Sequence, residues 1–189
     1  MSRMTLSDFE ARYRADPDPW GYMTSAYERD KYAATLAACG AGPFDHALEL
    51  GASIGVFSAM LAPRCLRLTT IDAAPTAVDI ARRRLANTRA VAVLDGVIPG
   101  AIPDGPYDLV VASEILYYMT AGELDATLDR IGVQTTPGGR LVAVHWRPDG
   151  PDRPLTADDV HEALRRAAWL RPLDRADTDG YRLDVLERQ

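Results

Sequence analysis

The stretch His46-Ala-Leu-Glu-Leu-Gly-Ala-Ser-Ile-Gly55 decides the fold of this chain. The apolar residues of 46–50 predict a short buried strand, and Val56 to Leu61 predict a helix directly after the glycine turn. A second strand over 66–71 ends at Asp72, about twenty residues beyond the turn. A strand, a glycine turn, a helix and a second strand ending in an acid are typical of a parallel sheet that binds a nucleoside at the carboxyl ends of its strands.

The same alternation of strand and helix continues to the end of the chain. Further strands are expected over 90–94, 107–112, 140–144, 169–173 and 181–186, with a Pro-Gly-Gly turn at 137–139. Helices are expected from Pro75, from Thr120 and from Thr156; each threonine has an acid three residues later, which forms a capping box. We predict an α/β fold: a doubly wound, mostly parallel seven-stranded sheet with a helix in each parallel crossover. The C-terminal hairpin is expected to add one antiparallel strand at the edge.

We predict a single domain over residues 1–189, because this length leaves little room for a second one. Residues 44–189 hold the strand–helix alternation and form the core. Residues 1–43 differ: a segment rich in proline and aromatic residues over 16–22 precedes a helix over about 25–38. This part is expected to form an N-terminal helical lid over the carboxyl ends of the strands.

Composition excludes several classes of function. Hydrophobic residues make up 47% and charged residues 25%, as in an ordinary globular protein, and the net charge of −6 disfavours nucleic acid and anionic membrane surfaces as partners. The sequence shows no export signal and no apolar run long enough to span a membrane, so a cytoplasmic location is expected. Two cysteines, Cys39 and Cys65, are too few for a disulfide framework and lack the spacing of a zinc site, so no metal is expected.

The glycine turn indicates a ligand without a pyrophosphate. Gly51 and Gly55 allow close approach of a ligand to the backbone, and the Asp72 carboxylate can accept hydrogen bonds from both ribose hydroxyls. A dinucleotide fingerprint would require glycine where Ser53 and Val56 stand, which weakens an NAD-dependent oxidoreductase as an interpretation. The alternative is that the glycines serve only a tight turn and the acids are solvated strand ends.

Five stretches together resemble the class I S-adenosylmethionine-dependent methyltransferases, from about residue 44 to the C-terminus. They are Leu-Glu-Leu-Gly-Ala-Ser-Ile-Gly (48–55), Ile-Asp (71–72), Leu-Asp-Gly (94–96), Tyr-Asp-Leu-Val-Val-Ala-Ser-Glu-Ile-Leu-Tyr-Tyr (107–118) and Pro-Gly-Gly-Arg-Leu-Val (137–142). Residues 16–20 and 24–32 are more narrowly similar to the nodulation N-methyltransferases (NodS), which methylate an amine of a chitooligosaccharide. The resemblance implies a Rossmann-like methyltransferase fold and S-adenosylmethionine as cofactor. Ser53 departs from the glycine usual in the first motif.

The resemblance also implies which residues hold the cofactor. The methionine part would lie among Glu49, Gly51, Ala52, Ser53 and Gly55, the ribose beside Asp72 and Ala73, the adenine beside Asp95, Gly96 and Val97, and the sulfonium near Ser113 and Glu114. From the lid, Trp20, Tyr22 and Tyr27 are expected to exclude water from the sulfonium. Lys31 is expected to meet the methionine carboxylate; the alternative is an exposed helix charge paired with Glu28 or Asp30.

Methyl transfer from such a cofactor is an in-line displacement that depends mainly on positioning. An acceptor that must lose a proton needs a base, and His145 at the end of the fifth strand is the best-placed candidate. Glu114 is the second candidate, with cofactor contact or helix capping as its alternatives. Tyr117 and Tyr118 are expected to line the acceptor pocket, with one of the two facing the core, and Trp146 to stack on a sugar or ring.

We predict methyl transfer to an amine or hydroxyl of a small molecule, with a sugar as one candidate; the oligomeric state is left open. The alternative is a non-catalytic module that binds S-adenosylmethionine or scaffolds a partner. Methylation of nucleic-acid amino groups is disfavoured because Ser113-Glu-Ile-Leu116 lacks the Asn/Asp-Pro-Pro-aromatic pattern. Methylation of cytosine carbon is disfavoured because Cys39 and Cys65 lie elsewhere.

Overall fold

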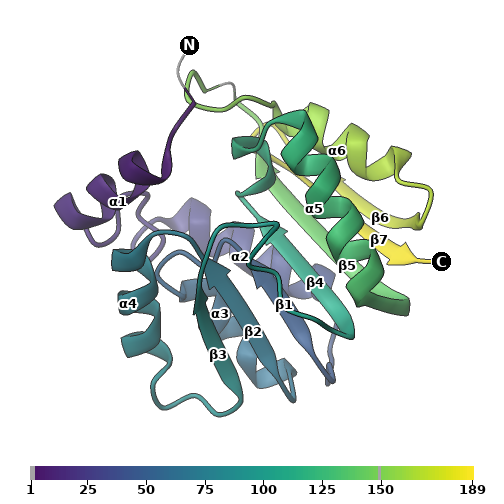
Figure 1. Cartoon of the computed structure of the whole chain (residues 1–189), viewed down its shortest axis with the longest axis horizontal. Helices are drawn as coiled ribbons and strands as arrows, with labels where there is room; N and C mark the ends of the chain where they lie inside the picture. The colour runs from purple at the N-terminus through teal and green to yellow at the C-terminus, as the bar shows by residue number, and fades with distance from the viewer. Residues whose placement is uncertain (1–2, 149) are drawn as a thin grey trace.

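The computed structural model describes residues 3–148 and 150–189. A seven-stranded sheet runs through its centre in the order β3-β2-β1-β4-β5-β7-β6 (Figure 1). The strands are β1 (Ala47–Leu50), β2 (Leu68–Asp72), β3 (Val91–Asp95), β4 (Tyr107–Ser113), β5 (Thr135–Trp146), β6 (Leu170–Asp177) and β7 (Tyr181–Arg188). β1 to β5 pair in parallel, and β7 is antiparallel to β5 and β6. The predicted α/β sheet with an antiparallel C-terminal strand is confirmed.

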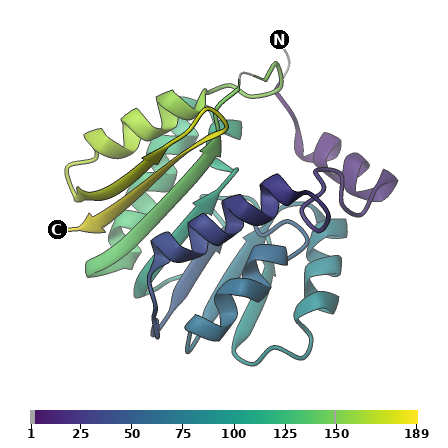
Figure 2. The same cartoon turned by 180° about the vertical axis from the view of Figure 1, so that it is seen from behind.

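Helices cover both faces of the sheet. They are α1 (Leu6–Ala15), α2 (Ala26–Cys39), α3 (Val56–Leu61), α4 (Pro75–Leu85), α5 (Ala121–Gln134) and α6 (Ala157–Arg166). α5 and α6 lie on one face, and α2 and α3 lie on the other, with α4 packed beside α3 (Figures 1 and 2). The central strands β1 and β4 are therefore buried on both sides, and Leu48 and Val111 have no exposed surface. This burial explains the unbroken apolar run at 109–112 in β4.

The C-terminal hairpin differs from the expectation in one respect. β7 lies inside the sheet between β5 and β6, so β6 is the edge strand. The distribution of apolar side chains explains this order: Leu183, Val185 and Leu186 of β7 are buried, whereas 171–175 of β6 are exposed. The more apolar strand takes the inner position, and Pro172 stands on the edge, where a missing N–H is tolerated.

Two connections also differ from the expectation. The crossover from β3 to β4 over 96–106 contains no helix, and prolines at 99, 103 and 106 oppose helical backbone there. The Pro-Gly-Gly segment 137–139 lies within β5 and is not a turn before it. The pairing with β4 passes from Tyr107–Thr135 directly to Leu109–Arg140, so these residues form a bulge.

The N-terminal segment contains a helix, α1, that the sequence interpretation did not include. Thr5 caps it and forms a capping box with Asp8, by the same pattern that begins α5 and α6. α1 lies against α4 at the carboxyl end of the sheet (Figure 1). The lid is therefore built from two helices and the aromatic segment between them.

Candidate active site

A cavity of about 670 Å³ lies at the carboxyl ends of β1, β2 and β4. Its floor comes from the turns after these strands, and its cover comes from α1, the segment 20–31 and the loop at 150–153. Aromatic and aliphatic side chains form most of the wall, and a few charged groups are placed among them. An apolar cleft with few polar groups, at this end of a parallel sheet, is the usual place for a small-molecule ligand.

Gly51 allows the floor of the cavity to form. Its φ of +76° favours glycine, and a Cβ there would lie 2.9 Å from the Cβ of Ile115. The N–H groups of Gly51 and Ala52 both donate to the carbonyl of Ile71, which ties the turn to β2. Ser53 stands where the usual motif has a glycine, and its φ of 49° lies in the left-handed region that favours glycine.

Asp72 joins this turn to the end of β2. Its Oδ2 accepts a hydrogen bond from the Ser53 N–H at 2.7 Å, and its Oδ1 accepts one from the Ala74 N–H at 3.0 Å. Burial raises the pKa of Asp72, although these backbone donors oppose the shift. A carboxylate has about four acceptor sites, more than these donors occupy, so Asp72, which lines the cavity together with Ala73, can still accept from ligand hydroxyls.

The residues expected around the adenine divide into two groups. Gly96 and Val97 line the cavity, and the Gly96 N–H donates to the carbonyl of Asp72 at 3.0 Å. Asp95 is exposed and is absent from the cavity wall that the structure describes. Its register partner across the sheet is Asp72.

Glu49 lies beneath the glycine turn and not on the main cavity wall formed by the described residues. It is 2% exposed, and its Oε2 accepts hydrogen bonds from the Ser58 and Thr70 hydroxyls at 2.5 and 2.9 Å. Burial raises the pKa of Glu49 to about 7. Glu49 and Ala52 border a much smaller void that adjoins the cavity, whereas Gly55 serves as the N-cap of α3.

A buried cluster of charges closes the other end of the cavity. Lys31 is only 2% exposed, and its Nζ donates to Glu114 Oε1 at 2.7 Å and to Glu28 Oε1 at 3.0 Å. The Tyr27 ring lies 5.2 Å from the same ammonium. Burial alone would lower the pKa of Lys31, but Glu114 and Glu28 raise it above its ordinary value. The pairing with Glu28 that was considered as an alternative is present, but Lys31 is not an exposed charge.

Glu28 and Glu114 differ in how fully they are bonded. Glu114 has a φ of 56°, and its Oε2 accepts from the Tyr117 hydroxyl and from the Trp146 N–H. Glu28 Oε2 lies 3.0 Å from Lys31 Nζ, but it is buried and no described donor is aligned with it. Burial raises the pKa of Glu28. The sequence interpretation named Glu28 only as a partner of Lys31, because nothing in the sequence shows that this face of the helix is turned inward.

Aromatic residues from the lid and from the end of β4 line the cavity. Trp20, Tyr22, Tyr27, Tyr117 and Tyr118 all contribute to its wall. Both tyrosines of η2 (Leu116–Tyr118) border the cavity, and Tyr117, which is 4% exposed, is also part of the buried core, as was expected of one of the adjacent tyrosines. Trp146 stands at the mouth, and the Arg153 guanidinium lies 5.0 Å from its ring and 4.5 Å from that of Tyr117.

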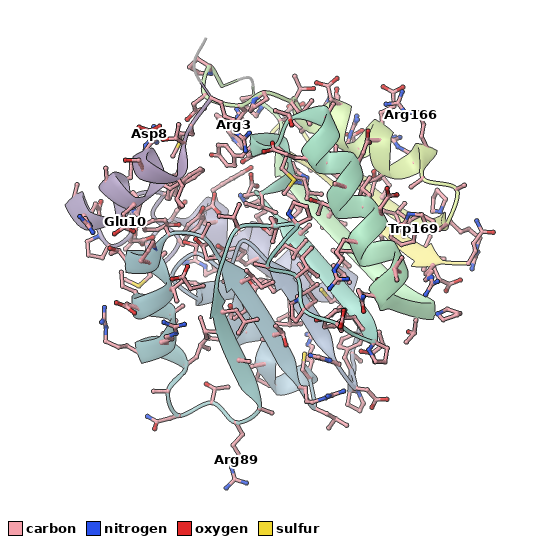
Figure 3. The ribbon with its side chains drawn as sticks, viewed as in Figure 1. Arg3, Asp8, Glu10, Arg89, Arg166 and Trp169 are labelled. Atoms are coloured by element: carbon pink, nitrogen blue, oxygen red, sulfur yellow. The ribbon has the colours of Figure 1, made fainter. Side chains whose placement is uncertain are left out.

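α1 adds contacts that the sequence interpretation missed. Phe9 packs edge-on against Tyr118, and the Tyr13 hydroxyl is 2.6 Å from Ser53 Oγ. Glu10 accepts hydrogen bonds from the N–H and hydroxyl of Thr76 at the start of α4. Arg3, which precedes α1, pairs with Glu123 at the start of α5. Glu10 and Arg3 are labelled in Figure 3. The capping-box pattern at Thr5 was the signal that could have revealed this helix.

His145 does not lie where a base for the acceptor would have to lie. It is fully buried and is absent from the cavity wall that the described residues form. Its Nε2 accepts a hydrogen bond from the Leu116 N–H at 3.2 Å, and burial holds the pKa of His145 well below its ordinary value. Direct proton removal by His145, expected from its place at the end of β5, therefore disagrees with the structure.

Comparison with protein families decides the relationship. The family model of nodulation protein S matches residues 5–146 of the chain. The chain belongs to the NodS family. This family places the chain among the class I S-adenosylmethionine-dependent methyltransferases, as its fold and motifs predicted.

Individual NodS proteins support this assignment. Nodulation protein S of Rhizobium tropici is 34% identical over 133 residues, which are 69% of this chain and 56% of the relative. The Bradyrhizobium diazoefficiens protein is 37% identical over 133 residues, 69% of this chain and 64% of the relative. The matched region thus spans less than two thirds of these curated NodS proteins.

Solved structures agree with the fold. The N-methyltransferase NodS from Bradyrhizobium japonicum WM9, in complex with S-adenosyl-L-homocysteine, superposes with a TM-score of 0.87 at 25% identity and covers 98% of this chain and 99% of its own. A putative methyltransferase from Pseudomonas syringae superposes with a TM-score of 0.77 at 35% identity and covers 87% of this chain and 100% of its own.

Within residues 3–148 and 150–189, no helix is long and apolar enough to cross a membrane.

Proposed function

We propose that this NodS-family chain transfers a methyl group from S-adenosylmethionine to an amine of a small molecule, with a sugar amine as one candidate acceptor. The observation that carries the proposal is the charge on the inner wall of the cavity. Two carboxylates, Glu28 and Glu114, face the single ammonium of Lys31, and one carboxylate oxygen lacks an aligned donor. A cluster in which two carboxylates share one ammonium suits a cationic amine.

The residues around the glycine turn fit the cofactor. Asp72 offers acceptor sites for ribose hydroxyls, Gly51 lets the turn at the cavity floor pack against Ile115, and Gly96 and Val97 provide a small and an apolar surface for a base. S-adenosylmethionine, when bound, supplies a methyl group that its positive sulfur has already activated. Contacts of the methionine part with Ser53 and of its carboxylate with Lys31 remain part of the proposal.

The cavity favours an amine over a hydroxyl acceptor because a hydroxyl needs a strong base. His145 is buried away from the described wall, and both oxygens of Glu114 already accept hydrogen bonds from Lys31, Tyr117 and Trp146. An ammonium only has to release one proton so that its nitrogen lone pair can attack. A carboxylate whose pKa is raised by burial is suited to accept that proton, and Glu28 is such a group.

Other residues of the wall take positioning roles in this proposal. Glu114 orients the amine and holds the Tyr117 hydroxyl, and Tyr117 and Tyr118 bound the acceptor space. Trp146, which is 39% exposed at the mouth, offers a ring face on which a sugar can stack. The expectations of a cytoplasmic location and of no nucleic-acid or membrane partner remain predictions.

A matched pair of acceptors tests the proposal. Methyl transfer from S-adenosylmethionine with a radiolabelled methyl group is measured with glucosamine against glucose and with butylamine against butanol. We expect transfer to nitrogen and none to oxygen. Transfer to the hydroxyl compounds alone would contradict the amine assignment. Binding of S-adenosylmethionine in calorimetry with no transfer to any acceptor of a broad amine and hydroxyl panel would favour the non-catalytic binding module.

A substitution tests the role of Glu28. We expect Glu28→Gln to lower kcat/KM for the amine by about 10- to 100-fold, the value of one hydrogen bond to a charged group. The control is Asp30→Asn, an exposed acid on the same helix, for which we expect wild-type kinetics. An unchanged kcat/KM in Glu28→Gln would remove Glu28 from the mechanism.

A further inference from the structure

A chain of buried polar groups lies behind the acceptor side of the cavity. The Leu116 N–H donates to His145 Nε2 at 3.2 Å, His145 Nδ1 lies 3.1 Å from His161 Nε2, and His161 Nδ1 lies 2.8 Å from Asp184 Oδ2. Both imidazoles have no exposed surface, and Asp184 is 3% exposed. The chain therefore crosses the core from the end of β4, through β5 and α6, to β7.

The backbone donor at one end determines where every proton of the chain lies. Because Leu116 donates to His145 Nε2, that nitrogen carries no proton, and neutral His145 must carry its proton on Nδ1. His145 then donates to His161 Nε2, so His161 also carries its proton on Nδ1 and donates it to Asp184. This is the arrangement in which each group has a partner and both histidines are neutral.

The far end of the chain is anchored electrostatically. Arg165 Nε lies 3.8 Å from Asp184 Oδ2, and Arg182 on β7, which pairs with Asp158 and Asp177, is a second cation near His161. The Asp184 carboxylate is thereby balanced in the core, where an isolated charge would be costly. Each hydrogen bond in the series is therefore donated toward Asp184, from the Leu116 amide at one end to the carboxylate at the other.

The near end of the chain touches the acceptor wall. Leu116 opens η2, the turn that presents Tyr117 and Tyr118 to the cavity. The His145 ring also packs edge-on against the Tyr117 ring at 5.1 Å. The Leu155 N–H, just before α6, donates to the carbonyl of Tyr117 at 3.2 Å, so the same region of the core holds η2 at a second point.

We propose that His145, His161 and Asp184 are positioning residues that hold η2, and with it Tyr117 and Tyr118, in the orientation the acceptor requires. An apolar core would fill this space without the cost of desolvating two imidazoles and a carboxylate, but it could not direct a hydrogen bond to the Leu116 amide. The inference about the acceptor rests on the proposed function. The structural part, the two tautomers and the restraint on Leu116, does not depend on it.

Nuclear magnetic resonance of the histidine rings tests the tautomers. The protein has three histidines, so labelling with ¹⁵N-histidine gives signals from three imidazole rings. His46 is not one of the hydrogen-bonded residues of the proposal. We expect His145 and His161 to be neutral and protonated on Nδ1 in the full-length protein near pH 7. A proton on Nε2 of His145, or a charged imidazole at either position, would overturn the proposal.

Hydrogen exchange tests the restraint on η2. We expect Asp184→Ala to change the His161 ring signals and to speed exchange of the Leu116 amide by about tenfold, the loss of one hydrogen bond. Asp184→Asn keeps an acceptor oxygen and is expected to restore slow exchange. Asp174→Ala, an exposed acid on β6, is the matched control. If the His161 ring signals change in Asp184→Ala but the Leu116 amide exchanges at the wild-type rate, the link between Asp184 and Leu116 is refuted. If Asp184→Ala does not fold, the tautomers of the wild-type protein test the proposal.

Kinetic measurements distinguish a positioning role of Asp184 from a general role in stability. With an amine that the acceptor screen identifies, we expect Asp184→Ala to raise KM for the amine and to leave the dissociation constant of S-adenosylmethionine unchanged. A loss of cofactor affinity equal to the loss in kcat/KM would indicate general destabilisation and overturn the positioning role. Failure of the acceptor screen would count against the proposed function alone, because the ring signals and the exchange rates are measured without an acceptor.

Discussion

Replacement of Glu49 by glutamine should remove a large pH dependence of stability. Glu49 is 2% exposed, and the hydroxyls of Ser58 and Thr70 donate to one of its oxygens. Burial raises its pKa from 4.5 to about 7, against the effect of these two donors. Glutamine has nearly the same shape and keeps an oxygen that can accept both hydrogen bonds, but it does not titrate.

The sign and size of the effect follow from proton linkage. The folded state keeps the proton of Glu49 up to a pH near 7, whereas the unfolded chain releases it near 4.5. The protonated Glu49 therefore stabilises the folded wild-type protein fully below about pH 4.5, and this stabilisation is lost as the pH rises from there to about 7. At roughly 1.4 kcal/mol per pH unit, the loss is about 3 kcal/mol between about pH 4.5 and about pH 8.5.

The assay is urea denaturation of wild type and Glu49→Gln at both pH values, without added nucleoside. Other titrating groups affect both proteins alike, so the difference between the two free energies of unfolding isolates Glu49. We expect the variant to gain about 3 kcal/mol relative to wild type on going from the acidic to the alkaline condition. Asp79→Asn, an exposed acid on α4, should show no such change. A difference that stays constant with pH would refute the reasoning.

Two further substitutions test the turn and its cover. Asp72→Asn should raise the dissociation constant of S-adenosylmethionine in calorimetry by about 10- to 100-fold, because a charged acceptor for the ribose hydroxyls is lost; an unchanged value would remove Asp72 from the nucleoside site. Tyr13→Phe should lower the free energy of unfolding by about 1 kcal/mol in urea denaturation, because the buried hydrogen bond to Ser53 is lost; wild-type stability would show that α1 does not depend on this bond.

Much of the sheet could be predicted because its signals are local. The apolar runs that end at Gly51 and Asp72, and the capping boxes at Thr120 and Thr156, each lie within a few residues, and the structure places strands and helices there. α1 has the same kind of cap at Thr5, so its signal is as local as theirs. The prediction of a turn at 137–139 was wrong because a bulge and a turn use the same residue types.

The roles of single side chains were harder to predict because they depend on contacts between distant segments. Lys31 becomes a buried ammonium only when β4 brings Glu114 against α2, and His145 is removed from the cavity only when η2 and α6 close over its two nitrogens. In the sequence, a histidine at the end of a strand looks the same whether it faces a ligand or the core. Burial and hydrogen-bond partners distinguish the two cases.

The sequence alone determined the class of fold, the order of most of its elements and the position of the glycine turn, because glycine, proline and the period of apolar residues act over a few positions. The family followed from the resemblance of its motifs. Tertiary structure decided that β7 lies inside the sheet, that α1 covers the cavity and that Glu28 faces inward. It also decided that His145 belongs to a buried chain ending at Asp184. Those outcomes depend on which surfaces meet when the layers pack, and packing joins residues that are far apart in the chain.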